Sequence, residues 1–137
     1  MQAFVLPDAL HEQLAVEARA AFPNECCGLI EGMAMPEGWR ATALHGSKNL
    51  AADPAQAFLI DPQVHFDLLR RLRGTGRAII GCYHSHPAGP GAPSERDRAE
   101  AIDDRFVWLV AGEGKVNAYL FGAGARSFAP LRVCRSA

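Results

Sequence analysis

The stretch GCYHSHPAGPGAPSERD, residues 81–97, brings four polar side chains with metal-binding chemistry into a short span of sequence. His84 and His86 lie two residues apart at the end of an apolar run, and residues with that spacing project from the same face of a strand. Ser94 begins a segment that is typical of a helix, and Asp97 follows three residues later. We therefore expect both imidazoles and the Asp97 carboxylate to meet where the strand ends and the helix begins.

The segment between the histidines and Ser94 predicts a tight connection. Pro87 biases His86 towards an extended backbone, so the histidine pair keeps strand geometry to its last residue. The sequence AGPGAP that follows favours a turn over regular structure. Two neutral imidazoles and one carboxylate form a ligand set that suits zinc and leaves a fourth position for water, which is the pattern of catalytic zinc sites.

Other interpretations of these residues stay open at this point. A His-x-His pair alone is a weak signal for metal binding. Ser94 and Asp97 also have the spacing of a helix N-cap and its capping-box partner, although glutamate or glutamine is more usual at the second of these positions. Cys26 or Cys27 with a histidine base would give a cysteine nucleophile, but no other residue pattern supports that chemistry.

The joint pattern resembles the JAMM motif of the MPN+ metalloproteases. That motif is a glutamate near the N-terminus, then His-[Ser/Thr]-His-Pro, a gap, a serine, a shorter gap and an aspartate. Glu25, the run from His84 to Pro87, Ser94 and Asp97 match it, and every spacing in the second half agrees. Flanking segments such as PNECCGLIEG are also similar to the family, and the resemblance covers roughly residues 5–121.

The resemblance implies a role for each matching residue. His84, His86 and Asp97 would hold one zinc ion. Glu25 would act as the general acid and base, and Ser94 would help to stabilise the oxyanion of the intermediate. Glu25 is assigned by the resemblance alone, because its separation along the chain from the histidines does not reveal where it lies.

The resemblance also implies a fold and a substrate. The MPN fold is a curved mixed β-sheet flanked by helices. The expected reaction is hydrolysis of a peptide or isopeptide bond after the Gly-Gly tail of a ubiquitin-like or sulfur-carrier protein, as in a compact prokaryotic member of the family. The alternatives are a non-catalytic MPN-type protein-binding module, which the five filled motif positions oppose, and a DNA-repair-associated relative, which a net charge of −1 does not favour.

Composition limits the class of protein further. A chain of 137 residues predicts one domain, residues 1–137. The near-neutral charge gives no electrostatic reason to expect nucleic acid or an anionic membrane as a partner. No apolar stretch reaches the ~18 residues of a membrane span. The N-terminus lacks the basic region of a signal peptide, so we expect a cytoplasmic protein whose four cysteines are free thiols.

Hydrophobic periodicity and turn residues predict the elements of a mixed α/β or α+β domain. Helices are expected at residues 8–21, 62–73 and 94–104. Asp61 is expected to cap the second of these helices. Strands are expected at residues 26–31, 39–45, 58–60, 77–84, 106–110, 116–121 and 128–133.

Three finer expectations concern turns and buried faces. The glycines and proline of residues 32–38 predict a turn. Alternation predicts that one face of the following strand carries Trp39, Ala41, Ala43 and His45. The buried face of the second helix is expected to consist of Val64, Leu68, Leu69 and Leu72.

The remaining polar residues have ordinary interpretations. We expect the histidines outside the motif to be surface or packed residues: His11, His45 and His65. Asn49 follows a predicted strand and favours a turn role, with a place at the site as the alternative. The cations Arg70, Arg71, Arg73 and Arg77 suit the end of a helix, and a docking patch for an acidic protein is the alternative.

Overall fold

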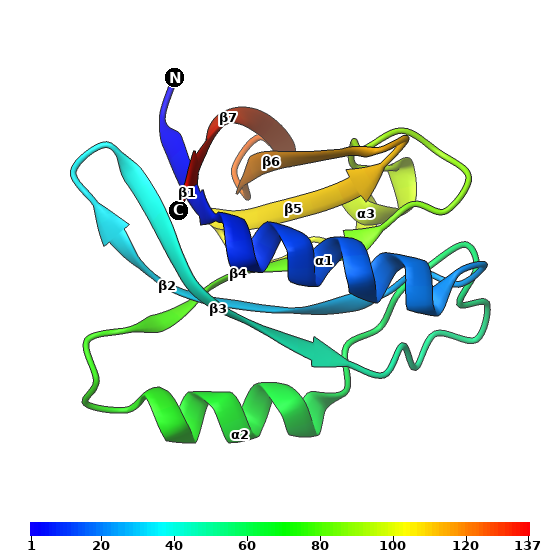
Figure 1. Cartoon of the computed structure of the whole chain (residues 1–137), viewed down its shortest axis with the longest axis horizontal. Coiled ribbons are helices and arrows are strands. Elements are labelled where there is room, and N and C mark those ends of the chain that lie inside the picture. The colour runs from blue at the N-terminus through cyan, green and yellow to red at the C-terminus, as the bar shows by residue number, and fades with distance from the viewer.

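The computed structural model describes residues 1–137 and contains a closed seven-stranded barrel with three helices on its outside (Figure 1). The strands are β1 (Ala3–Pro7), β2 (Cys27–Met35), β3 (Gly38–Ser47), β4 (Ala78–Ser85), β5 (Phe106–Gly112), β6 (Lys115–Gly122) and β7 (Ser127–Ser136). The helices are α1 (Asp8–Ala21), α2 (Pro62–Leu72) and α3 (Glu95–Glu100). None of the helices has both the length and the apolar character that crossing a bilayer demands.

The strand order is β1-β3-β2-β4-β5-β6-β7, and β7 pairs with β1 to close the sheet on itself. The pairs β1–β3, β1–β7 and β4–β5 are parallel, while the other neighbours are antiparallel. The predicted class, a curved mixed sheet flanked by helices, is therefore confirmed. The first strand was not predicted, although it is the one that completes the barrel.

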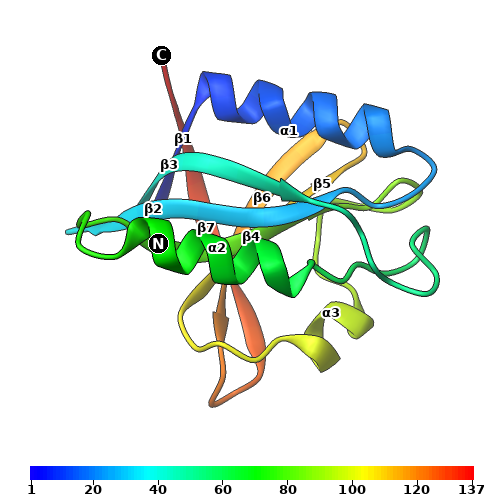
Figure 2. The ribbon, with the colours of Figure 1, turned by 90° about the horizontal axis from the view of Figure 1, so that it is seen from below.

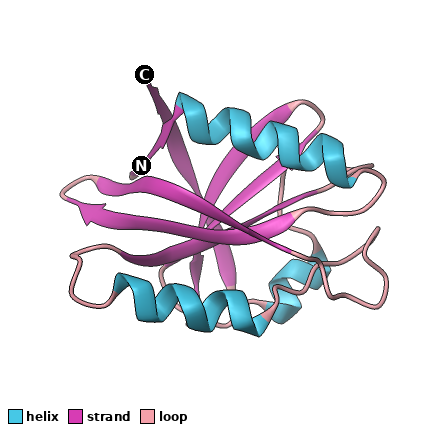
Figure 3. Ribbon diagram, turned by 60° about the horizontal axis from the view of Figure 1, so that its bottom comes forward, coloured by secondary structure: helices cyan, strands magenta, loops and turns pink.

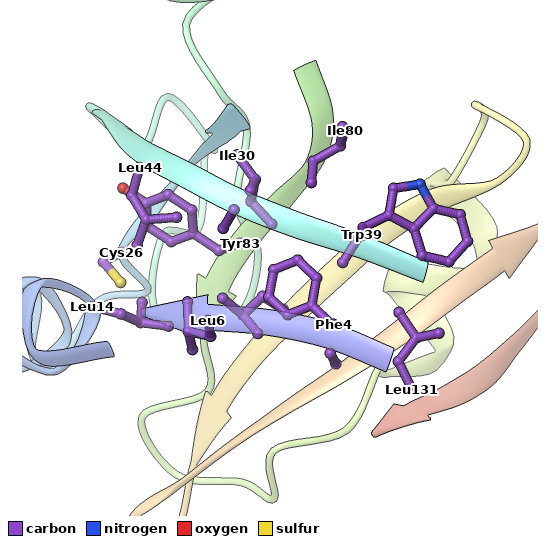
Figure 4. Packing of buried hydrophobic residues seen from close by; sticks show 14 residues of the cluster. Phe4, Leu6, Leu14, Cys26, Ile30, Trp39, Leu44, Ile80, Tyr83 and Leu131 are labelled. Atoms are coloured by element: carbon purple, nitrogen blue, oxygen red, sulfur yellow. The ribbon is translucent and has the colours of Figure 1, made fainter. Parts of the chain in front are cut away.

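The strands bury two hydrophobic clusters on their two faces. The first cluster lies with α1 and includes Phe4, Leu14 and Tyr83 (Figure 4). The second lies under α2 and includes Leu68, Cys82 and Trp108. Figures 2 and 3 show α1 on one side of the barrel and α2 and α3 on the other. In β4, Cys82 belongs to the second cluster and its neighbour Tyr83 to the first, so successive side chains point to opposite faces. The histidine pair follows Cys82 at steps of two residues and therefore lies on the face that carries α2 and α3.

Helix α1 has the predicted bounds. Its apolar stripe places Leu14 in the first cluster with no exposed surface. The Tyr83 hydroxyl donates a hydrogen bond of 2.7 Å to Glu17 of this helix. The Gln13 amide donates one of 3.0 Å to the Leu44 carbonyl of β3. These contacts fix α1 against the strands that precede the site.

Helix α2 also begins where it was predicted, with the Asp61 side chain accepting a hydrogen bond from the Gln63 backbone at 2.9 Å. The prediction that Leu69 faces inward is wrong, because 52% of this residue is exposed. The helix touches the sheet only along a narrow stripe that includes Leu68 and Leu72, and successive residues turn by about 100° around the axis. Leu69 falls outside that stripe.

The turn predicted at residues 32–38 is shorter than expected and occupies only residues 36–37, because β2 continues to Met35 through a β-bulge. Gly32 pairs with Ala41 and the preceding residue pairs with Ala43, so Thr42 is the extra residue of β3. A Cβ atom at Gly32 would lie 2.2 Å from the Arg40 carbonyl oxygen. Glycine is therefore needed here because β2 and β3 approach closely, and not because the chain turns.

The bulge also changes which residues of β3 share a face, so the predicted buried face is only partly right. Trp39 and Ala41 enter the first cluster as expected, but beyond the extra residue Leu44 replaces Ala43 and His45 on that face. A one-residue insertion reverses the alternation of every later side chain in the strand.

Two further boundaries differ from the predictions. Residues 58–60 form no strand and contribute only an isolated bridge between Ile60 and Asn49. Helix α3 ends at Glu100 and does not reach residue 104. The Arg126 guanidinium donates hydrogen bonds of 2.7 Å and 2.9 Å to the carbonyls of Arg98 and Ala101, which satisfies the last turn of the helix from outside.

Gly81 of β4 gives a test of the barrel packing. A Cβ atom there would lie 2.1 Å from the Val107 carbonyl oxygen of β5. We expect Gly81→Ala to lower the free energy of unfolding by at least about 2 kcal/mol, because a parallel strand would have to shift. Urea unfolding measures this. Gly124→Ala is the matched control, since nothing lies within 4 Å of its Cβ position, and an equal loss there would contradict the packing explanation.

Candidate metal centre

The two histidines and Asp97 converge at the C-terminal end of β4. The Nε2 atoms of His84 and His86 are 3.0 Å apart. One carboxylate oxygen of Asp97, Oδ2, lies 3.0 Å from the His84 Nε2 atom and 3.3 Å from the His86 Nε2 atom. The strand end thus supplies two nitrogens and the first turn of α3 supplies one oxygen, as the sequence predicted.

The chemistry of this triangle fits a tetrahedral zinc ion. Two ligand atoms about 2.0–2.1 Å from such an ion are separated by about 3.3 Å, close to the three distances found here. Hydrogen bonds alone do not explain all three contacts, because a neutral imidazole has one N–H and the carboxylate has none. The three atoms together are a donor set for a cation.

Neighbouring groups orient both rings. The Nδ1 atom of His86 lies 2.9 Å from the Pro90 carbonyl, a contact that needs the proton on Nδ1 and leaves the Nε2 lone pair facing Asp97. The His84 ring is fully buried and stacks on Phe58, with ring centroids 4.3 Å apart. Trp108 packs edge-on against both rings, with its centroid 5.7 Å from those of His84 and Phe58.

Glu25 joins this group from the segment between α1 and β2. Only 5% of the residue is exposed, and a carboxylate oxygen lies within 4.8 Å of a ring nitrogen of both His84 and His86. Its Oε1 atom is buried without a hydrogen-bond partner. Antiparallel pairing of Cys27 with His84 brings β2 and β4 together at this point. Two carboxylates therefore face the histidines, and that of Asp97 is the one in direct contact.

The electrostatics of the two carboxylates differ. Burial raises the pKa of Glu25 to about 7, although the nearby His86 opposes the shift. Burial alone would also raise the pKa of Asp97, but its hydrogen bonds to His84 and His86 outweigh burial and hold that pKa well below the usual range. Asp97 is thus a permanent anion, whereas Glu25 exchanges a proton near neutrality, as a general acid and base should.

The histidines differ as well. Burial lowers the pKa of His84, so this ring is neutral and able to ligate. Burial also lowers the pKa of His86, but hydrogen bonds to Asp97 and to the Pro90 carbonyl outweigh it and raise that pKa. Because metal binding needs a free lone pair, a metal ion and a proton would compete for His86.

Ser94 and Asp97 also form the capping box that was the alternative interpretation. The Asp97 N–H donates to the Ser94 hydroxyl at 3.1 Å, and the Ser94 N–H donates to Asp97 Oδ2 at 2.9 Å. The oxygen that receives this bond is the one that touches both histidines. Ser94 itself is exposed and lines a cleft of ≈ 330 Å³ together with Glu25 and His86. The two interpretations are compatible, because the cap would hold the candidate ligand oxygen in place.

Asn49 does more than form a turn, because its side chain connects several backbone segments around the site. Its side-chain amide donates to the carbonyls of Glu25 and Ala57 at 3.1 Å and 2.9 Å. Its Oδ1 atom accepts two backbone hydrogen bonds from the loop of residues 50–59. That loop carries Phe58, the stacking partner of His84. Asn49 therefore ties the backbone of Glu25 to the ring that supports a candidate ligand.

We expect Asn49→Asp to lower kcat by about 10–100-fold while zinc stays bound, the range found when an outer partner of a metal site is lost. The aspartate keeps the acceptor oxygen but turns a second oxygen towards the Glu25 and Ala57 carbonyls, which displaces Glu25. Steady-state kinetics, zinc content and the thermal midpoint test this. A normal kcat at full zinc occupancy would show that the position of Glu25 does not depend on Asn49.

The other polar candidates lie outside the site. His45 contacts Glu31 at 2.9 Å, and Arg77 contacts the same carboxylate. Arg77 is therefore not part of a free cluster with Arg70 and Arg71. Burial raises the pKa of Cys27 to about 12, which disfavours the thiolate that a cysteine nucleophile needs. All four cysteines are free, and three of them are buried.

The barrel and the His-Ser-His-Pro strand end define a domain of the JAB/MPN class. The chain belongs to the family of prokaryotic homologs of the JAB domain, whose model matches residues 7–122. It is 33% identical over 98 residues to a desampylase of Haloferax volcanii, covering 71% of this chain and 69% of the relative. It is 33% identical over 119 residues to a probable TtuB-protein conjugate cleaving protease of Thermus thermophilus, covering 87% and 76%.

Solved structures show the same fold. A protein from Desulfitobacterium hafniense superimposes with a TM-score of 0.84 at 25% identity, over 97% of this chain and 92% of that one. A JAB1/MPN domain protein from Archaeoglobus fulgidus gives a TM-score of 0.56 at 17% identity, over 98% and 97%. The predicted family and fold are confirmed, and the enzyme names of the two sequence relatives support a hydrolase of the JAB family.

Proposed function

We propose that this protein is a zinc-dependent isopeptidase that hydrolyses the peptide or isopeptide bond after the Gly-Gly tail of a ubiquitin-like or sulfur-carrier protein. The observation that carries the proposal is the convergence of two histidine nitrogens and one Asp97 oxygen within 3.0–3.3 Å of one another. A buried carboxylate, Glu25, lies beside them. The relatives named as a desampylase and a TtuB-conjugate protease support the substrate class.

In this proposal His84, His86 and Asp97 hold one zinc ion. When bound, the ion polarises the scissile carbonyl and makes hydroxide available at neutral pH. Glu25 accepts the proton from the attacking water and passes it to the leaving amine, a role that suits a carboxyl group with a pKa of about 7.

Ser94 is proposed to stabilise the developing oxyanion. Its hydroxyl accepts the bond from the Asp97 N–H at 3.1 Å, which leaves its own proton free to donate into the cleft. The cleft walls between His86 and Ser94 are mainly glycine, alanine and proline. Such a wall leaves room for a tail of two glycines and offers little to a bulky side chain.

The test is cleavage of a folded ubiquitin-like carrier that has residues beyond its Gly-Gly, with the products identified by mass spectrometry. We expect a single cut after the second glycine that depends on added zinc. Cleavage at other positions, or of unfolded peptides only, would contradict the proposed specificity. Binding of the carrier by zinc-loaded protein without any cleavage would favour the alternative, a non-catalytic MPN-type binding module.

A further inference from the structure

A second hollow adjoins the catalytic cleft on the side of α1. It has a volume of ≈ 510 Å³ and lies between α1 and the β5–β6 hairpin, which Figure 3 shows close to the C-terminal half of the helix. His86 and Pro87 line both this hollow and the ≈ 330 Å³ cleft that contains Glu25. The two spaces therefore meet at the residues that directly follow β4.

The lining of this hollow has a definite chemical character. Small residues, among them Ala15 and Ala111, form its floor, and Phe22 stands at its rim with 65% of its surface exposed. The charged lining residues are two basic groups, Arg19 and Lys115, and one acidic group, Glu113, and His11 adds a polar ring. Excess positive charge around an apolar floor suits a ligand with an apolar part and a negative charge.

Arg19 is available to such a ligand. Its only ion-pair partner is Glu12 at 3.7 Å, and the side chains of both residues are about two-thirds exposed, at 68% and 70%. Exposed pairs of this kind are weak, so the pair competes little with a ligand. Lys115 takes part in no ion pair.

The position of Glu25 indicates which part of the substrate enters the hollow. Glu25 donates its proton to the leaving amine, so the leaving side of the scissile bond must pass the Glu25 end of the cleft. The rim residue Phe22 lies three residues before Glu25 in the sequence. A hollow of ≈ 570 Å³ with Trp108 and Phe58 in its wall lies on the face that carries α2 and α3, and it shares no lining residue with the other two.

We propose that the α1 hollow binds the residues that follow the scissile bond and that it favours a negative charge there, either an acidic side chain or a C-terminal carboxylate. This inference rests on the proposed isopeptidase function, which it extends to the leaving group. Arg19 and Lys115 are the residues assigned to recognise that charge.

The experiment uses zinc-loaded full-length protein and one carrier ending in Gly-Gly, followed by matched two-residue extensions. The extensions are Ala-Glu with a free carboxylate, Ala-Glu amide, Ala-Gln amide and Ala-Lys amide. We expect both glutamate forms to show a KM about three- to tenfold lower than Ala-Gln amide, the size that two or three exposed charge pairs give. Comparison of free and amidated Ala-Glu separates the carboxylate from the side chain.

The double variant Arg19→Gln/Lys115→Gln should remove this preference, so that the glutamate extensions show the KM of Ala-Gln amide. Arg70→Gln/Arg71→Gln, on the outer face of α2, is the matched control and should retain it. Equal KM values for acidic and neutral extensions in the wild type, or a preference that survives the double variant, would overturn the inference while leaving the proposed function intact. Absence of cleavage with every extension would overturn both.

Discussion

Glu25→Gln is expected to lower kcat by about 10³–10⁴-fold while the protein keeps its fold, its zinc and its affinity for substrate. General acid–base groups contribute about 10²–10⁴-fold, and in the proposed mechanism this one acts in both proton transfers, which places the loss near the upper end. The amide nearly matches the carboxyl group in size, so the buried position stays filled. It cannot accept the proton from water, however, and it cannot protonate an amine.

Glu31→Gln is the matched control for this variant, because Glu31 is the other buried glutamate of the segment that begins at Glu25. Its carboxylate contacts His45 and Arg77, four residues along β2 from Cys27, the residue that pairs with His84, or about 13 Å away. We expect Glu31→Gln to lower the thermal midpoint and leave kcat nearly unchanged. Near-normal turnover in Glu25→Gln at full zinc occupancy would require another catalytic base.

The retained substrate affinity has a practical use. Glu25→Gln protein should hold an uncleaved carrier conjugate long enough to be isolated with it, because the cleft and the candidate ligands are unchanged. Recovery of the intact conjugate by the variant and of the cleaved products by the wild type would separate loss of chemistry from loss of binding.

The sequence predicts those parts of the site that depend on local geometry. His84 and His86 were found because residues two apart share a strand face, and Asp97 because its spacing from Ser94 fits the first turn of a helix. Glu25 could not be placed in this way. It reaches the histidines through the antiparallel pairing of β2 with β4, and only the family resemblance anticipated that contact.

The errors share a physical origin, which is that distant residues decide local structure. Gly32 resembles a turn glycine, yet it is required by the approach of Arg40 from the next strand. Arg126 ends α3 earlier than the sequence of the helix predicts, from a hairpin later in the chain. Asn49 gives only a turn signal, because its partners Glu25 and Ala57 come together through the fold.

The carboxylates of Glu25 and Asp97 both lie beside the histidine pair, and a substitution of Asp97 tests which of them is the zinc ligand. We expect Asp97→Asn to weaken zinc binding by more than about 100-fold, beyond the loss found for outer partners of metal sites. A neutral amide replaces an anion that lies 3.0 Å and 3.3 Å from the two histidine nitrogens. Hydrolysis should fall in parallel, because the chemistry depends on the bound ion.

Two measurements separate this ligand role from the capping role of the same residue. Zinc should raise the thermal midpoint of the wild type and of Ser94→Ala, because an ion that binds only the folded state stabilises it. Ser94→Ala should lose about 0.5–2 kcal/mol of stability with its cap and still bind zinc. Asp97→Asn should show no zinc-dependent shift. If it still binds one zinc per chain, Asp97 is only a cap, and Glu25, within 4.8 Å of both histidines, becomes the third ligand.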